Sequence, residues 1–165
     1  MIRIGLGRDL HRLVSGRPFL LGGVKLPSEQ GELGHSDGDV LIHAIIDALL
    51  GAIGLGDIGE LFPPSDPAWE HADSRELLKI ASTRVFMAGW RLVNVDCVVT
   101  CEQPKILPHR EAIRQSLAEI LRIPVETIFV KGKTNEGMDA LGRGAAVEAL
   151  ALALLERIPE KYENP

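Results

Sequence analysis

The chain has 165 residues, of which 45% are hydrophobic, 4% aromatic and 25% charged, and its formal net charge is −5. A chain of this length can bury one ordinary hydrophobic core, so we expect a single domain over residues 1–165. The acidic balance argues against a nucleic-acid partner. Short apolar stretches and an N-terminus without a signal-peptide layout predict a cytoplasmic protein with no membrane partner.

The N-terminal segment alternates between apolar and other side chains, which predicts a β-strand that continues into Asp9 and His11. Side chains two residues apart on a strand project from the same face, so these two are expected to lie side by side. The next segment, 19–26, has a Gly-Gly pair between two apolar runs and predicts a short hairpin.

A helix is predicted over 39–53, with an apolar stripe formed by Ile42, Ile45, Ile46, Leu49 and Ile53. Ser36 or Asp37 is expected to cap its N-terminus. His43 lies on the polar stripe, one helical turn from both Asp39 and Asp47. Either carboxylate is a candidate to accept the second imidazole proton. The alternatives are that Asp39 interacts with the helix dipole and that Asp47 faces solvent.

The middle of the chain predicts a helix over 73–89, begun by a capping box, and a strand over 92–101. Segment 54–59 spells G-x-G-x-x-G, but it follows a helix rather than a strand, so we reject a dinucleotide site. Cys97 and Cys101 are roughly 13 Å apart along the predicted strand, too far for a disulfide. We expect both to be reduced and buried.

The last third of the chain predicts a helix over 110–122 and a short strand over 127–131. The tail, 145–158, is rich in Ala and Leu, and its propensity alone favours a helix. The alternation of elements predicts an α/β fold, an α+β sandwich in which helices pack on one face of a mixed β-sheet.

Asp9, His11 and His43 are candidate metal ligands, because two imidazoles and one carboxylate with an open fourth position suit zinc. The pattern Asp-x-His alone is a weak signal, and a surface carboxylate near a structural histidine is the alternative. The polar segment 35–39, just before His43, favours the metal site.

A second group of polar residues lies near the C-terminus. Segment 131–136 ends a predicted strand with two lysines, Thr134 and Glu136, and Arg143 follows between two glycines. These residues suit phosphate recognition, with Glu136 as ligand of a hard cation, while a flexible charged loop is the alternative. Segment 101–108, with two prolines, is either a rigid surface that receives a base or a plain connection.

Three segments together resemble the 2-C-methyl-D-erythritol 2,4-cyclodiphosphate synthase family of the non-mevalonate isoprenoid pathway. They are Gly7 to His11, then His35 to Val40 with His43, Asp47 and Gly56 to Gly59, and finally Lys131 to Glu136 with Gly142 to Gly144. Length and order match over nearly the whole chain. Three positions depart from the common pattern: Lys133, Ala140 and Ala145.

The resemblance implies a bacterial homotrimer with sheets facing its axis and active sites between subunits. The implied substrate is 4-diphosphocytidyl-2-C-methyl-D-erythritol 2-phosphate, a cytidine diphosphate-linked small molecule, and the products are the cyclic diphosphate and CMP. It also implies that the tail from Ala145 is a strand, contrary to its helix propensity, and we follow the resemblance there.

The site residues that the resemblance implies fall into groups. Asp9, His11 and His43 would hold Zn²⁺, and Glu136 would hold Mg²⁺ or Mn²⁺ on the diphosphate. His35, Ser36 and Thr134 would be catalytic, with His35 and Ser36 on a mobile loop. The substrate-binding residues would be Asp57, Gly59, Lys105, Ile106, Leu107, Gly132, Lys133, Thr134 and Arg143, those from Lys105 to Thr134 being supplied by the neighbouring subunit.

The expected reaction is an intramolecular phosphoryl transfer in which the 2-phosphate oxygen attacks the β-phosphorus and CMP leaves. A phosphate is already anionic at neutral pH, so orientation and charge stabilisation suffice. Two alternatives stay open at this point. One is a zinc phosphoesterase that activates water; the other is a trimeric binding protein with a structural metal.

Overall fold

The computed structural model describes residues 1–159. Residues 160–165 of the expected domain lie outside the described residues. The strands are β1 (Ile2–Ser15), β2 (Phe19–Leu21), β3 (Val24–Leu26), β4 (Gln30–Leu33), β5 (Trp90–Thr100), β6 (Ile128–Lys133) and β7 (Ala146–Arg157). The α-helices are α1 (Val40–Ala52), α2 (Ile58–Leu61), α3 (Ser74–Met87), α4 (Arg110–Leu121) and α5 (Asp139–Gly142), with 3₁₀ turns η1 (Pro67–Trp69), η2 (Leu107–His109) and η3 (Val125–Thr127).

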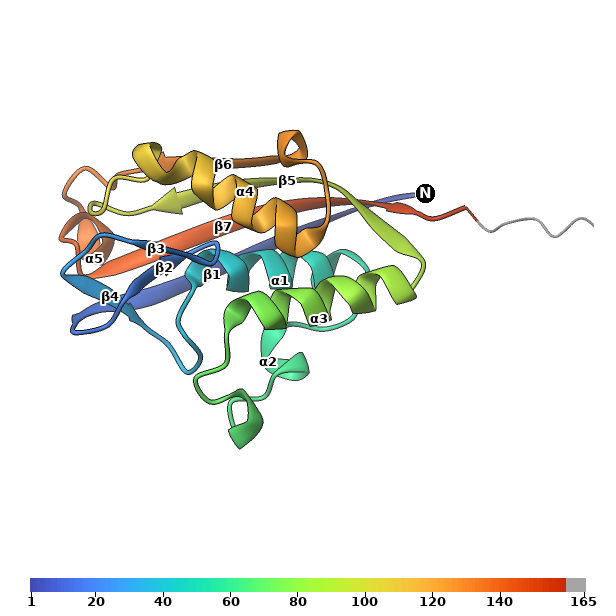
Figure 1. Cartoon of the computed structure of the whole chain (residues 1–165), viewed down its shortest axis with the longest axis horizontal. Helices are drawn as coiled ribbons and strands as arrows, with labels where there is room; N and C mark the ends of the chain where they lie inside the picture. The colour runs from blue at the N-terminus through green and yellow to red at the C-terminus, as the bar shows by residue number, and fades with distance from the viewer. Residues whose placement is uncertain (160–165) are drawn as a thin grey trace, which may run out of the picture.

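A five-stranded mixed sheet has the order β4-β1-β7-β5-β6, and β2 and β3 form the separate predicted hairpin. Only the pairing of β5 with β6 is parallel among the described strands of this sheet. Helices α1, α3 and α4 lie on one side of the sheet, as Figure 1 shows. The predicted sandwich is therefore confirmed.

Strand β7 occupies the middle of the sheet although its Ala- and Leu-rich sequence favours a helix. Its burial alternates, with Ala149, Ala151 and Ala153 at most 1% exposed and the intervening residues more exposed. The inward side chains of β7 are small because α1 lies close to both β1 and β7 and leaves little room between helix and sheet. Tertiary pairing on both edges thus overrides local propensity, as the resemblance implied.

Helix α1 lies so close to β1 that only glycine fits at two inward positions of the strand. A Cβ at Gly5 would overlap the carbonyl oxygen of Ala48, and one at Gly7 would overlap that of Ala44. The next inward residue along β1 is Asp9. His43 lies on the facing helix, directly before Ala44. This tight contact positions the two candidate ligands against each other.

Asp39 begins α1, which corrects the expectation of a Ser36 or Asp37 cap. Its backbone is extended, and its fully buried carboxylate accepts a hydrogen bond from Ile42 N at 3.0 Å. The same carboxylate accepts from Gly22 N at 3.0 Å and Gly23 N at 2.6 Å. Asp39 therefore joins the start of the helix to the β2–β3 turn, a tertiary role that sequence spacing does not reveal.

The other face of the sheet is open and largely apolar. Ile2, Ile4 and Leu6 on β1 are each more than 60% exposed, and Phe129 on β6 and Leu152 on β7 are also exposed. Ion pairs cross this face, with Arg8 Nε 2.6 Å from Glu148 Oε1 and Lys131 Nζ 2.6 Å from Asp96 Oδ2. None of the helices among residues 1–159 is long and apolar enough to span a membrane.

Cys97 and Cys101 are both free and buried, as predicted. Burial raises the pKa of the Cys97 thiol far above its usual value, and it raises that of Cys101 to about 12. Both thiols therefore stay protonated and unreactive.

Candidate metal centre

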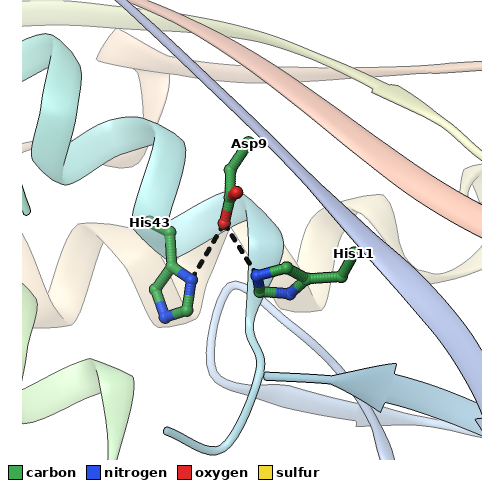
Figure 2. A group of neighbouring side chains, drawn as sticks. All are labelled: Asp9, His11 and His43. Atoms are coloured by element: carbon green, nitrogen blue, oxygen red, sulfur yellow. Dashed lines mark hydrogen bonds and ion pairs between the residues drawn. The ribbon is translucent and has the colours of Figure 1, made fainter. Parts of the chain in front are cut away.

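The three predicted metal ligands converge on one point between β1 and α1. Asp9 Oδ2 lies 3.0 Å from His11 Nε2 and 3.0 Å from His43 Nδ1. Figure 2 shows both imidazoles turned toward this carboxylate. One ligand atom from each residue lies within 4.8 Å of the others. The two imidazole rings meet edge to face, at 76°. The strand supplies two ligands and the helix one, as the sequence predicted.

The hydrogen bond on the far side of His11 determines which of its nitrogens faces the centre. His11 Nδ1 lies 2.7 Å from the carbonyl oxygen of Gly38. A carbonyl only accepts, so Nδ1 carries a proton and Nε2 is the nitrogen that faces Asp9. Nε2 lies 3.0 Å from the Asp9 carboxylate, where it donates a hydrogen bond when protonated and can bind a metal ion when it is not. This donor set fits a divalent metal ion.

The charges at the centre are tuned by the same contacts. Burial alone would raise the pKa of Asp9, but hydrogen bonds and charge from His11 and His43 hold it well below its usual range. Burial opposes the protonated form of His11, yet Asp9 raises the pKa of His11 above its ordinary value. Asp9 is therefore an anion throughout the physiological range and ready to bind a cation.

The second nitrogen of His43 has partners that sequence analysis missed. Nε2 lies 3.0 Å from Ser36 Oγ and 3.0 Å from Ser74 Oγ. Neither predicted carboxylate has this role, because Asp39 serves backbone N–H groups and Asp47 accepts from Ile58 N at 2.8 Å. The signal for Ser74 was its place just after Asp73 at a helix start, which we interpreted only as part of a cap.

A cavity of about 240 Å³ opens beside the candidate ligands. His35, which is exposed, and Ser36, which is buried, line it together with Gly59. Its other wall is apolar and is formed by Ile58, Phe62, Pro64, Trp69 and Leu77. Asp57 lies at the start of α2, where its Oδ1 accepts from Glu60 N at 2.9 Å. The cavity thus combines a cation site with an apolar surface.

The remaining predicted residues form a second group elsewhere on the same chain. Lys105 and Arg143 line a separate cavity of about 640 Å³, and Thr134 Oγ1 donates to Glu136 Oε1 at 2.9 Å. Gly132 packs against Ile106, which is buried. Leu107 and Lys133 are exposed. None of these residues lines the cavity beside Asp9, so one chain does not bring the two groups together.

Comparison with known proteins agrees with this geometry. The YgbB family model matches residues 2–156. A protein of Treponema denticola named 2-C-methyl-D-erythritol 2,4-cyclodiphosphate synthase is 58% identical over 93% of this chain and 96% of its own length. A solved structure of such a synthase, in a form bound to CDP, is 45% identical with a TM-score of 0.87 over 93% of this chain and 100% of that one.

A bifunctional IspDF from Campylobacter jejuni is also similar, with 39% identity and a TM-score of 0.92 over 96% of this chain. The chain covers 43% of that longer protein. The chain belongs to the YgbB family, whose similar members carry the synthase name. The expectations of the family and of an enzyme are thereby confirmed.

Proposed function

We propose that the chain converts 4-diphosphocytidyl-2-C-methyl-D-erythritol 2-phosphate to 2-C-methyl-D-erythritol 2,4-cyclodiphosphate and CMP, within the non-mevalonate isoprenoid precursor pathway. An oxygen of the 2-phosphate forms a bond to the β-phosphorus. The bond from that phosphorus to the bridging oxygen breaks, and CMP leaves with this oxygen. The observation that carries the proposal is the convergence of Asp9, His11 and His43 beside the cavity in a chain of this family.

The metal at this centre is proposed to be Zn²⁺, held by Asp9, His11 and His43. Three nitrogen and oxygen ligands with an open position are the usual set for catalytic zinc. When bound, the ion polarises a phosphoryl oxygen and stabilises charge. Glu136 is proposed to hold Mg²⁺ or Mn²⁺ with the substrate phosphates, because its exposed carboxylate lies beside the hydroxyl of Thr134.

The chain's own residues orient the substrate and exclude water. The apolar wall suits a methyl-bearing carbon skeleton, and Asp57 and Gly59 are proposed to contact the hydroxyl groups beside it. His35 and Ser36 are proposed as catalytic residues of a loop that closes over this end. Folding the substrate back on itself contributes on the order of 7 to 11 kcal/mol, so orientation is expected to be the largest effect.

The nucleotide is proposed to bind the second group of residues on an adjacent copy in a homotrimer. Lys105, Ile106, Leu107, Gly132, Lys133, Thr134 and Arg143 would form that surface. Two observations support a trimer: the two groups are separate within one chain, and the outer sheet face is exposed and apolar. We also propose that the chain acts as one domain over 1–165 in the bacterial cytoplasm.

The experiment is incubation of purified protein with the cytidine diphosphate substrate, with and without Zn²⁺ and Mg²⁺, followed by mass spectrometry. Metal-dependent release of CMP with an equal amount of cyclic diphosphate is the expected result. An open-chain product would indicate a phosphoesterase instead. Absence of turnover with every metal would indicate a binding protein.

A further inference from the structure

We propose that Ser74 and Asp37 are positioning residues for His43, which orient its imidazole and set the nitrogen that carries its proton. The proposal rests on the metal centre of the proposed function, since it concerns how one ligand is prepared. Neither residue is a predicted ligand or substrate contact. Together they form a relay that runs from a loop carboxylate, through a helix hydroxyl, to the imidazole.

The geometry of the relay assigns each proton. Ser74 is fully buried at the first residue of α3, and its hydroxyl donates to Asp37 Oδ1. The other Asp37 oxygen, Oδ2, accepts from Ser74 N at 3.1 Å. Because the hydroxyl proton is used in this way, Ser74 Oγ offers only a lone pair to His43 Nε2, 3.0 Å away. His43 Nε2 is therefore the protonated nitrogen.

The consequence lies on the opposite side of the ring. With Nε2 engaged as a donor, His43 Nδ1 is the nitrogen that faces Asp9 Oδ2, at 3.0 Å, and the one available to a metal ion. His11 reaches the same state through the carbonyl of Gly38. Each imidazole thus turns a defined nitrogen toward the centre, the one that a metal ion would bind, and this orientation lowers the cost of binding it.

Ser36 alone does not determine that His43 Nε2 carries the proton. Its Oγ also lies 3.0 Å from His43 Nε2, but among the described residues no carboxylate accepts its hydroxyl proton. A hydroxyl that is free to rotate can either donate or accept. Only Ser74 has its proton directed elsewhere, by Asp37.

Helix capping does not account for the Ser74 side chain. The neighbouring Asp73 is already the N-cap of α3, and its carboxylate accepts from Arg75 N at 2.9 Å. Asp37 has a second role, because its N–H donates to Ala72 O at 3.1 Å and so attaches the loop to the segment before α3. That contact uses backbone atoms, which side-chain substitution leaves in place. Asp37 Oδ1 also accepts from Asp39 N at 3.3 Å, a contact that Asp37→Ala removes and Ser74→Ala leaves in place, so Ser74→Ala separates the roles.

The test is a double-mutant cycle on metal affinity, with Ser74→Ala, Asp37→Ala and the double variant titrated with Zn²⁺ against a chelating dye. We expect each single variant to lose about 10- to 100-fold in affinity, as is typical when an outer partner of a ligand is removed. The double variant should lose no more than the larger single loss, because Asp37 acts through Ser74. Ser74→Thr, which keeps the hydroxyl, should retain most of the affinity.

Ser82→Ala provides the matched control, since Ser82 lies on the same helix but lines a different surface cavity. Its affinity should equal that of the unaltered chain. Wild-type affinity in Ser74→Ala, or losses that simply add in the double variant, would overturn the relay while leaving the metal centre intact. Failure of the unaltered chain to bind Zn²⁺ would instead contradict both the relay and the proposed metal.

Discussion

At the scale of single residues, the centre depends on three side chains whose nearest partners are known. His43 is 8% exposed and is held by Asp9 on one side and by two serine hydroxyls on the other. Every polar atom of its ring is therefore engaged, and its position is determined by neighbours from β1, the loop before α1 and α3. Such a side chain is expected to matter more for binding than for folding.

His43→Gln is expected to lower Zn²⁺ affinity and CMP release by more than about 100-fold, since loss of a ligand should exceed the loss of an outer partner. The melting temperature should change little, because a catalytic metal with an open position is not required for folding. Metal content, turnover and thermal unfolding measure these effects. His71→Gln, at a histidine whose side chain is 76% exposed, is the control and should change neither metal content, turnover nor melting temperature. A collapse of stability in His43→Gln would favour a structural metal.

Glu32 is a buried carboxyl group whose effect on stability depends on pH. Burial, and then the nearby charge of Asp39, raise its pKa well above the usual value. One of its oxygens accepts from Val40 N at 3.4 Å, while Oε2 has no hydrogen-bond partner. The folded state therefore holds a proton that the unfolded state releases. The stability that Glu32 contributes is present below the unfolded pKa and is lost as pH rises through the folded one.

Glu32→Gln should consequently unfold at higher urea concentration than the unaltered chain at about pH 8, and at a similar concentration at about pH 4. The gain in the free energy of unfolding is expected at the higher pH, where the unfolded carboxyl group is ionised and the folded one is not. Urea unfolding at both values measures it. An equal gain at both would show that repacking, rather than ionisation, is responsible.

At the scale of elements, the contact between α1 and β1 determines the geometry of the centre. Gly7→Ala would place a methyl group against the backbone of Ala44, so the helix must move. We expect a loss of about 1–3 kcal/mol in the free energy of unfolding and weaker Zn²⁺ binding. Chemical unfolding and dye competition measure both quantities.

Gly51→Ala is the matched control for this prediction. Gly51 lies within α1, and a Cβ there would meet no other atom within 4 Å. Alanine in a helix is favoured over glycine by roughly 0.5–1 kcal/mol, so this variant should be more stable with unchanged metal affinity. If both variants behaved alike, the close approach of α1 to β1 would not be what positions His43.

At the scale of the whole molecule, the outer sheet face is expected to be covered by further copies of the chain. Leu6→Lys would place a charge among exposed apolar side chains of that face, where Leu6 is 64% exposed. We expect light scattering to show loss of the assembly, and catalysis to fall because the two groups of site residues no longer meet. Phe86→Lys, equally exposed on α3, should leave both unchanged. A monomeric unaltered chain that is fully active would refute the shared site.

Sequence by itself predicted the elements with strong periodicity and the three candidate metal ligands. Period-two alternation placed Asp9 and His11 on one face of β1, and helical spacing placed His43 on the polar side of α1. These patterns hold because side-chain direction follows directly from local backbone geometry. The resemblance supplied the strand state of β7, which its composition concealed.

Only the tertiary structure decided which groups meet across elements. Asp39 and Asp47 share a helix stripe with His43, yet they serve backbone groups of other segments, whereas Ser74, distant in sequence, reaches the imidazole. The physical reason is that each buried polar group must find a partner wherever the fold places one. Spacing within one helix limits which partners a side chain can reach. The packing of loop, strand and second helix decides which of these partners it binds.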